Sequence, residues 1–558
     1  MQTKPWHAHY DQGVPVHIDY RQVPVSGMLA RTAARFPDRP ALSFMNATFS
    51  FAALEEEVRR CAAALQRIGV KKGTRVAVQV PNIPQGVIAF QGAMRAGAEV
   101  VMTNPLYTLR EVEHQWQDAD VEVAITTDFI WASTLRPNRA RLRPTQYVVA
   151  QIPEYLGFPL NFLAPLKLKG MGRYAKFPDE PGVHRFKRLV KGSPPEPQPV
   201  DVQMDDIAVL QYTGGTTGLS KGAVLTHRNL SANVQQIHGW FPEAVEGQEV
   251  LLLALPLFHV FGLSVGMNWS IWCGAKMVLA ANPRDIPDLV KLIAKHHVSL
   301  LPAVPAMFNA INNHPGVAQL DLSSVKFCFS GSAPLPRDVQ DKFERMTGAT
   351  IVEGFGMSET SPVTHVNPLK GTRKSGSVGI PVSDTDARIV DIEDPTQELP
   401  IGQEGELIVQ GPQVMRGYWK RPEESAEVLH EGWMRTGDLA VMDEDGYFRI
   451  VGRKKDMINC SGMKVFPDEV DNVLVSHPKI LEAATIGVPD ADRGETVKSF
   501  IVLVPGATMT EKEVEVFARE NLAAYKIPRQ VEFLAELPKS SVMKVLRREL
   551  RDREIAKG

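Results

Sequence analysis

The sequence contains few cysteines, almost no net charge and no apolar run at its start. Its four cysteines (Cys61, Cys273, Cys328, Cys460) are far apart among 558 residues, which excludes a disulfide framework and a zinc cluster with ligand spacing. The formal net charge of -2 gives no reason to expect a nucleic-acid partner. The first residues, MQTKPWHAHYDQ, lack the apolar core of a secretory signal. We therefore expect a cytoplasmic protein.

Charged residues are absent from residues 250–275, VLLLALPLFHVFGLSVGMNWSIWCGA. A run of ~20 apolar residues is long enough to cross a bilayer, but Pro256, Gly262 and Asn268 interrupt this one. A membrane span is the alternative reading of this stretch. We predict instead a strand over residues 250–255, a turn and a buried helix.

Chain length and the order of apolar patterns predict an α/β fold with two domains. A chain of 558 residues is too long for one hydrophobic core. Short β-branched runs such as TRVAVQV (74–80) alternate with helical patterns such as that over 83–98, as a doubly wound sheet requires. We expect a large N-terminal domain over residues 1–453, with doubly wound sheets, helices and a small β-rich portion. A small mobile α+β domain is expected over residues 454–558.

A stretch rich in glycine and threonine, QYTGGTTGLSKGAVLTH, occupies residues 211–227 between apolar flanks. Glycines expose backbone N–H groups, and the threonines and Lys221 add donors and charge, a combination that suits a polyphosphate. The phosphate loop of nucleotide hydrolases carries lysine directly after its last glycine, followed by serine or threonine. Here Lys221 precedes Gly222 and Ala223 follows, so that motif is excluded. A surface loop without a ligand is the alternative.

Five motifs, all in one order, point to a known family. They are YTGGTTGLSKG, VEGFGMSET, WMRTGDLA, GRKKDMINCSGMKVFPDEV and LPKSSVMKVLRREL, and they span residues 212–550. This set closely resembles the adenylate-forming superfamily. Within it, NPRDIPDLVK, GPQVMRGYW and LRRELRD are most similar to bacterial long-chain fatty acyl-CoA synthetases. The resemblance implies that a carboxylate and ATP give acyl-AMP and pyrophosphate, and that the thiol of CoA then displaces AMP.

The resemblance also implies a nucleotide site drawn from most of these motifs. Both reactants of the first step are anions, so the site must neutralise charge and align them. Thr213 and Glu359 would hold a Mg²⁺ ion that screens the triphosphate. Phe355 would stack on adenine, and Asp438 would accept hydrogen bonds from the ribose hydroxyls. The implied ATP- and AMP-binding residues are Thr213, Gly214, Gly215, Thr216, Thr217, Gly218, Lys221, Gly331, Glu353, Gly354, Phe355, Ser358, Asp438, Arg453 and Lys544.

Lys544 is the catalytic residue that the resemblance implies for the first step, together with Thr213 and Glu359. Its ammonium group can bridge the attacking carboxylate and the α-phosphate as charge builds. Family members usually carry glycine before this lysine, whereas this sequence has Met543. If that glycine adopts a positive φ, methionine would strain the loop by roughly 1 kcal/mol.

For the second step, the family rotates its small domain about a hinge. The corresponding residue here is Lys455. Ser461 and Gly462 would then line the path of the CoA thiol, where a larger side chain at Gly462 would block access. A carrier-protein thiol is the alternative acceptor.

The acyl pocket is expected among Trp240, His259, Val304 and Gly331. An aliphatic lining without arginine or lysine favours a fatty acid over a dicarboxylate. An aryl acid stays open as a substrate, and so does a non-catalytic fatty-acid-binding protein. A homodimer also stays open.

Residues 154–176 combine phenylalanine and leucine with lysine and arginine. Such a composition is typical of a segment that lies in a membrane interface. We therefore expect peripheral contact with the inner face of the cytoplasmic membrane. Prolines and glycines within the segment argue against a continuous amphipathic helix.

Overall fold

The computed structural model describes residues 4–213, 220–460, 463–490, 494–540 and 545–557. The chain divides into two compact units. The larger unit comprises His7–Thr385 and Gln410–Gly432, and the smaller one comprises Met1–Trp6, Asp386–Val409 and Trp433–Gly558. The predicted boundary of a small C-terminal domain, between residues 453 and 454, stays a prediction.

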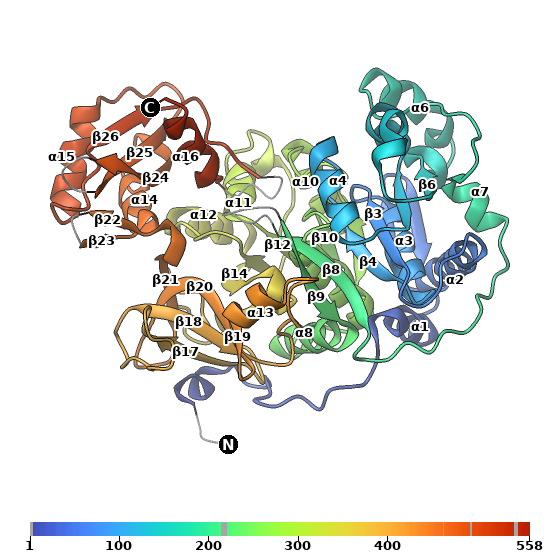
Figure 1. Cartoon of the computed structure of the whole chain (residues 1–558), viewed down its shortest axis with the longest axis horizontal. Coiled ribbons are helices and arrows are strands. Elements are labelled where there is room, and N and C mark those ends of the chain that lie inside the picture. Colours follow the sequence, from blue (N-terminus) through green and yellow to red (C-terminus); the bar gives the residue numbers. More distant parts are fainter. Residues whose placement is uncertain (1–3, 214–219, 461–462, 491–493, 541–544, 558) are drawn as a thin grey trace. The chain divides into compact units, whose positions relative to one another are not determined.

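A seven-stranded sheet of the larger unit carries the glycine- and threonine-rich stretch at one edge (Figure 1). Its strands pair in parallel, except that the last is antiparallel to its neighbour. Strand β5 is buried along its whole length, as a parallel sheet covered on both faces requires. The order is β7 (Val183–Arg185), β6 (Gln146–Ala150), β5 (Val123–Thr127), β3 (Arg75–Gln79), β4 (Glu99–Met102), β8 (Ile207–Thr213) and β9 (Lys221–Thr226).

A nine-stranded sheet completes the larger unit. Its central strands are parallel and its outer strands are antiparallel. The order is β16 (Ile380–Pro381), β15 (Val363–Val366), β14 (Thr350–Gly356), β13 (Phe327–Ser330), β12 (Leu300–Ala303), β10 (Val250–Leu253), β11 (Lys276–Leu279), β1 (Pro40–Phe44) and β2 (Ala47–Ser50).

The uncharged stretch over residues 250–275 forms the predicted strand, turn and buried helix. Strand β10 is followed by a π-helical turn η5 (Phe261–Asn268) and helix α9 (Trp269–Cys273), and nearly all of these residues are buried. Among the described residues, no helix combines the length and apolar character that a membrane crossing needs.

Several helices of the larger unit bury one face, as their sequence periodicity predicts. In α2, for example, Leu54, Val58, Cys61 and Leu65 are buried on the same side. The helices are α1 (Val25–Arg35), α2 (Phe51–Arg67), α3 (Pro84–Arg95), α4 (Leu109–Asp118), α5 (Asp128–Ile130), α6 (Leu160–Gly170), α7 (Phe186–Lys191), α8 (His227–Trp240), α10 (Ile286–His296), α11 (Pro305–Asn312), α12 (Arg337–Thr347) and α13 (Pro422–Val428).

The smaller unit contains two sheets. One includes β17 (Asp386–Val390), β18 (Gly405–Gln410), β20 (Trp433–Met442) and β21 (Phe448–Arg453). The other has the order β23 (Met463–Val465), β22 (Ile458–Cys460), β25 (Gly494–Leu503) and β24 (Ile480–Asp490), with β26 (Gln530–Phe533) beside β25. It is accompanied by α14 (Pro467–Val475), α15 (Glu511–Asn521) and α16 (Arg547–Ile555). The predicted fold class is confirmed; the mobility of the C-terminal part stays a prediction.

Helix α6 covers only residues 160–170 of the segment 154–176. The expectation that prolines and glycines prevent a continuous amphipathic helix over the whole segment is confirmed. Pro159 and Gly170 stand at the two ends of α6, where helices tolerate these residues. Pro165 alone lies inside, where it removes one N–H donor from the helix.

All four cysteines are buried, and none forms a disulfide. Burial raises the pKa of the Cys61, Cys273 and Cys328 thiols. Raised pKa values keep these groups in the unreactive thiol form at neutral pH.

Candidate functional site

The predicted phosphate loop connects two paired strands. Thr213 ends β8, Lys221 begins β9, and the two residues lie directly opposite each other in the antiparallel pair. A Cβ atom on Gly222 would lie 2.9 Å from Cε2 of Tyr212, so glycine is required at this position. The other predicted loop residues, Gly214, Gly215, Thr216, Thr217 and Gly218, lie outside the described residues.

Tyr418 joins two of the predicted site residues and was not identified from the sequence. Backbone hydrogen bonds and a β-bridge hold residues 416–419 alongside β9. The Tyr418 hydroxyl donates to Oε1 of Glu359 at 2.8 Å, and Nζ of Lys221 lies 5.4 Å from the centre of its ring. The motif GPQVMRGYW therefore brings together the lysine of one predicted motif and the carboxylate of another.

Glu359 supplies a buried carboxylate beside the hairpin. It lies in the 3₁₀ turn η7 (Ser358–Thr360), which follows β14 and contacts β8 and β9. The residue is 7% exposed, and its carbonyl accepts from the Met415 N–H at 2.8 Å. Burial, together with the negative charge of Glu359, raises the pKa of Tyr418, so the phenol stays a hydrogen-bond donor to the carboxylate.

The donor set around Glu359 fits a magnesium ion that arrives with a nucleotide. Among the described residues, no group of three or more His, Cys, Asp or Glu side chains is arranged to hold a metal ion. Mg²⁺ in nucleotide sites is bound by one or two protein side chains and completes its shell with phosphates and water. Glu359 with the hydroxyl of Thr213 meets that requirement.

Gly331 and Gly354 adjoin each other near the ends of β13 and β14. A Cβ atom on Gly331 would lie 3.2 Å from Cε1 of Phe261 and 3.8 Å from the Gly354 carbonyl oxygen. A Cβ atom on Gly354 would lie 3.0 Å from the His365 carbonyl oxygen. The partly exposed Phe355 ring contacts His365 edge to face, with 6.0 Å between ring centres. Both glycines therefore permit close packing, of the Phe261 ring against Gly331 and of the His365 backbone against Gly354.

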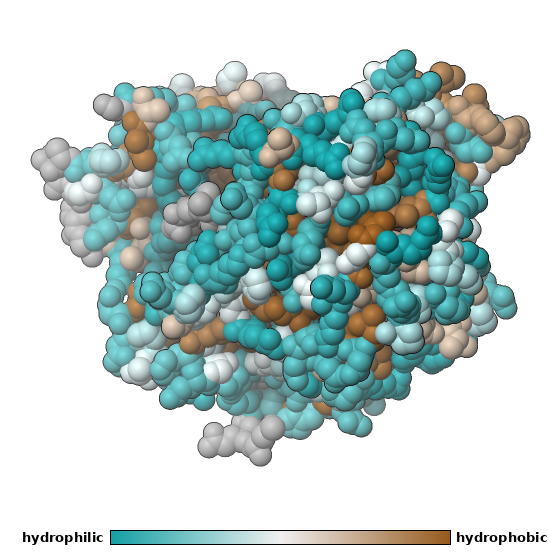
Figure 2. Space-filling view, turned by 45° about the vertical axis from the view of Figure 1, so that its right-hand side comes forward, coloured by the Kyte–Doolittle hydropathy of each residue, from teal (hydrophilic) through white to brown (hydrophobic). Residues whose placement is uncertain are grey.

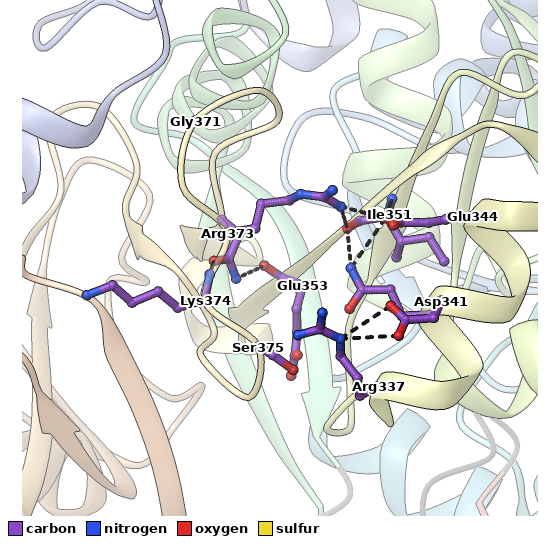
Figure 3. Close-up of a pocket in the computed structure, with 11 residues that line it drawn as sticks. Arg337, Asp341, Glu344, Ile351, Glu353, Gly371, Arg373, Lys374 and Ser375 are labelled. Atoms are coloured by element: carbon purple, nitrogen blue, oxygen red, sulfur yellow. Dashed lines mark hydrogen bonds and ion pairs between the residues drawn. The ribbon is translucent and has the colours of Figure 1, made fainter.

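Glu353, the residue before Gly354, lines a polar cavity of about 280 Å³ (Figure 3). Burial, partly offset by the Leu335 N–H, raises the pKa of Glu353 to about 8. Its carboxyl group is therefore mostly neutral at pH 7 and can donate a hydrogen bond. The other lining residues are Arg337, Gln340, Asp341, Glu344, Ile351, Asn367, Gly371, Arg373, Lys374 and Ser375. Arg337 pairs with Asp341 one turn along α12, and Arg373 pairs with Glu344 of the same helix from a separate segment.

Two predicted acyl-binding residues, Val304 and His259, are next to residues that contact Gly331. Val304 is 5% exposed and follows Ala303, whose carbonyl accepts from the Gly331 N–H at 3.4 Å. His259 precedes η5, and its Nδ1 accepts from the Phe261 N–H at 3.3 Å. Phe261 is the residue whose ring faces Gly331. Val304, His259 and Gly331 are thus linked through direct neighbours.

Trp240 occupies a core position at the end of α8. The side chain is buried, its Nε1–H donates to the Asn367 carbonyl at 3.3 Å, and its ring meets Tyr10 edge to face at 5.0 Å. These contacts fix the indole within the larger unit. Its role in acyl binding stays a prediction.

In the smaller unit, β20 and β21 bring Asp438 and Arg453 together. The two residues lie opposite each other in the antiparallel pair, and Nε of Arg453 is 2.9 Å from Oδ1 of Asp438. The Asp438 side chain is 3% exposed, and its backbone N–H donates to Oγ1 of Thr436 at 3.0 Å. Arg453 compensates the buried charge and orients the carboxylate. A carboxylate held in this way can accept hydrogen bonds from a diol.

Lys455 is an exposed residue between two anchored neighbours. Nζ of Lys454 donates to the Ile392 carbonyl at 2.7 Å, which ties it to the loop after β17. Oδ1 of Asp456 accepts from Arg551 of α16 at 2.9 Å, which ties it to the C-terminal sheet and its helices. The chain therefore passes at Lys455 from one sheet of the smaller unit to the other, as a hinge residue should.

The remaining predicted site residues, Ser461, Gly462 and Lys544, lie outside the described residues, as does Met543. Their described neighbours are paired. Cys460 and Met463 lie opposite each other in β22 and β23, and Lys539 forms a β-bridge with Val545. The roles of these four residues stay predictions.

Replacing Tyr418 with phenylalanine should lower kcat/KM for ATP by about tenfold in the adenylate formation that the motif resemblance implies, because a hydrogen bond to a charged group contributes about 1.5–3 kcal/mol. The phenylalanine ring is expected to keep its contact with the Lys221 ammonium group. Pyrophosphate release at varied Mg²⁺ concentration measures the effect. Tyr155→Phe is the matched control, since the Tyr155 hydroxyl donates to Glu57 at 2.7 Å away from the predicted site residues. Equal kinetics for the two variants would show that the Tyr418 hydroxyl takes no part in the site.

Comparison with known proteins places the chain among enzymes with similar sequence and fold. Residues 29–419 match the family described as AMP-binding enzyme, and residues 469–544 match the AMP-binding enzyme C-terminal domain. The long-chain-fatty-acid–CoA ligase of Bacillus subtilis (strain 168) is 44% identical over 556 residues, covering 99% of this chain and 98% of that protein. The corresponding ligase of Escherichia coli O157:H7 is 41% identical over 561 residues, covering 98% of each. The crystal structure of the anthranilate CoA ligase AuaEII in complex with anthranoyl-AMP has a TM-score of 0.85 at 26% identity, covering 96% of this chain and 98% of that one.

Proposed function

The chain belongs to the AMP-binding enzyme family, and we propose that it is a long-chain-fatty-acid–CoA ligase. It joins a fatty acid to ATP to give acyl-AMP and pyrophosphate, and then transfers the acyl group to the thiol of CoA with release of AMP. Full-length similarity to the ligases of B. subtilis and E. coli supports the substrate class. The observation that carries the reaction is the link from Lys221 through Tyr418 to Glu359.

In the proposed first step, the protein neutralises and aligns two anions. Thr213 and Lys221, at the two ends of the hairpin loop, contact the phosphates together with residues 214–218. Glu359 and Thr213 hold Mg²⁺, which supplies charge screening of the triphosphate when bound. Lys544 contacts the carboxylate and the α-phosphate as charge develops.

The nucleoside is held by residues from several of the motifs. Phe355 stacks on adenine, with Gly331, Glu353 and Gly354 around the base, and Ser358 donates to the α-phosphate. Asp438 accepts from the ribose hydroxyls, with Arg453 beside it.

In the proposed second step, the C-terminal residues turn about Lys455 and exchange the Lys544 segment for the segment with Ser461 and Gly462. Thioester formation then proceeds without an enzyme thiol, which agrees with the burial of Cys460. The acyl chain lies near His259, Val304 and Gly331, with Trp240 at its boundary.

We also propose peripheral association with the inner face of the cytoplasmic membrane, because long-chain fatty acids partition into bilayers. A homodimer is compatible with this proposal and is tested by the mass of the protein in solution.

AMP formation with a panel of acids from acetate to stearate, with and without CoA, tests the substrate class. We expect kcat/KM to rise by about tenfold for every two added methylene groups, since each buried methylene contributes about 0.8 kcal/mol, until the pocket is filled. AMP release should require CoA for turnover. A preference for benzoate or anthranilate would favour the aryl-acid alternative. Turnover with a carrier-protein thiol but not with CoA would show that the carrier protein, rather than CoA, is the acyl acceptor.

A further inference from the structure

Helix α6 and its flanks carry an unusual concentration of exposed apolar side chains. Five of the thirteen large hydrophobic residues that are exposed in the described chain lie between residues 158 and 171: Phe158, Phe162, Leu163, Leu166 and Met171. Figure 2 shows brown atoms gathered at its upper right, the corner that carries α6 in Figure 1. Contiguous exposed apolar groups mark a surface that contacts a partner.

The exposed and buried residues of α6 are on opposite faces of the helix. At about 100° per residue, Phe162, Leu163 and Leu166 fall within one arc of about 100°. They are 69%, 54% and 74% exposed. Leu168 falls on the opposite face and is buried. Lys167 and Lys169 border the exposed arc on its two sides, where their long side chains can reach a lipid headgroup region.

Charge around this face has one sign. Lys167, Lys169, Arg173 and Lys176 are all exposed, and residues 156–177 contain no aspartate or glutamate. None of these four side chains makes an ion pair or hydrogen bond with another described residue. Four cations without counter-charges, set beside apolar groups, complement a surface that is both apolar and anionic.

Both ends of the segment are fixed to the rest of the larger unit. Before α6, the Asn46 side chain donates to the Gly157 carbonyl at 2.9 Å and accepts from the Gly157 N–H at 3.0 Å. After α6, the Ala175 N–H donates to the buried Asp128 carboxylate at 2.9 Å. The exposed arc is therefore a property of the folded unit rather than of a free chain segment.

We propose that the α6 surface, defined as the five exposed apolar residues and four cations named above, is the part of the molecule that inserts into an anionic lipid bilayer. The proposal rests on the membrane association inferred above and specifies its site. Phe158, Phe162 and Leu166 enter the acyl region, while the lysines and arginine contact headgroup phosphates. Symmetric dimerisation through the same surface is disfavoured, because it would bring the four cations of each copy together.

Vesicle co-sedimentation of the full chain tests this site. We expect the wild type to bind equimolar phosphatidylcholine–phosphatidylglycerol vesicles more tightly than phosphatidylcholine vesicles. The double variant Phe162→Ser, Leu166→Ser should bind both about a hundredfold more weakly, given the apolar area withdrawn from lipid. Lys167→Glu, Lys169→Glu should weaken binding to the anionic vesicles by roughly thirtyfold and leave binding to neutral vesicles unchanged. Ile555→Ser, at a side chain 73% exposed on α16, is the matched control and should bind like the wild type.

Activity on a water-soluble medium-chain acid should stay at the wild-type level in both double variants, whereas activity on vesicle-embedded palmitate should fall with binding. Wild-type-like binding of both variants would overturn the α6 site while leaving membrane association intact. Failure of the wild type to bind either vesicle would overturn membrane association itself. A wild-type dimer that the Phe162→Ser, Leu166→Ser variant converts to monomer, without vesicle binding, would assign the surface to a second copy of the chain.

Discussion

The Lys544→Ala variant is expected to form acyl-AMP about a thousandfold more slowly than the wild type, the scale of losing one group that stabilises developing charge. Both reactants of the first step are anions, and the ammonium group of Lys544 is the cation proposed to bridge them. In the second step the Lys544 segment is proposed to have left the site. Conversion of supplied acyl-AMP to acyl-CoA should therefore stay within about threefold of the wild-type rate, because no transition-state contact is lost there.

The two half-reactions are measured separately, by pyrophosphate release without CoA and by thioester formation from chemically prepared acyl-AMP. Lys557→Ala is a suitable control, because Lys557 is an exposed, ion-paired lysine of the same unit. Equal losses in both half-reactions of Lys544→Ala would show that the lysine stabilises the fold or the nucleotide site rather than the adenylation transition state.

Lys455→Pro should separate the half-reactions by restricting the backbone. Proline fixes φ near -65°, and Lys455 stands between Lys454, tied to the loop after β17, and Asp456, tied to α16. One orientation of the C-terminal sheet should then be favoured. We expect the half-reaction that needs the other orientation to fall by at least about a hundredfold, since small misplacements of catalytic groups have effects of that size.

The side chain of Lys455 is exposed, so Lys455→Ala removes the side chain and leaves the backbone free to rotate. A difference between Lys455→Ala and Lys455→Pro is then due to the proline ring. This control should retain both half-reactions. Wild-type rates of both steps in Lys455→Pro would place the pivot at another residue.

Local sequence patterns predicted most of the fold, because each depends on neighbours in the chain. The run TRVAVQV became β3, the following pattern became α3, and the uncharged stretch became β10 with a buried helix. The apolar periodicity of each segment indicates which face of the strand or helix is buried, and the burial of that face contributes most to its stability. The ends of the predicted phosphate loop, Thr213 and Lys221, are paired because two apolar strands flank it.

Tyr418 could not be predicted in this way. Its contact with Glu359 joins residues 59 positions apart, and its strand-like pairing with β9 has no local pattern. Helix α6 is shorter than the segment 154–176 for a local reason that the sequence does show: Pro159 and Gly170 stand at its two ends. Asp438 and Arg453 illustrate the favourable case, since a short hairpin places them opposite each other.

The burial of all four native thiols makes this chain suitable for spectroscopic labelling without removal of any cysteine. Maleimide reagents react with thiolates, so a cysteine introduced at an exposed position should be modified selectively. Ile401 and Val516 are 50% and 47% exposed; Ile401 precedes β18, and Val516 lies on α15, so the two stand on either side of Lys455 in the chain. A pair of nitroxides at these positions would report the distance between the two sheets of the smaller unit in solution, and its change as substrates are added in turn.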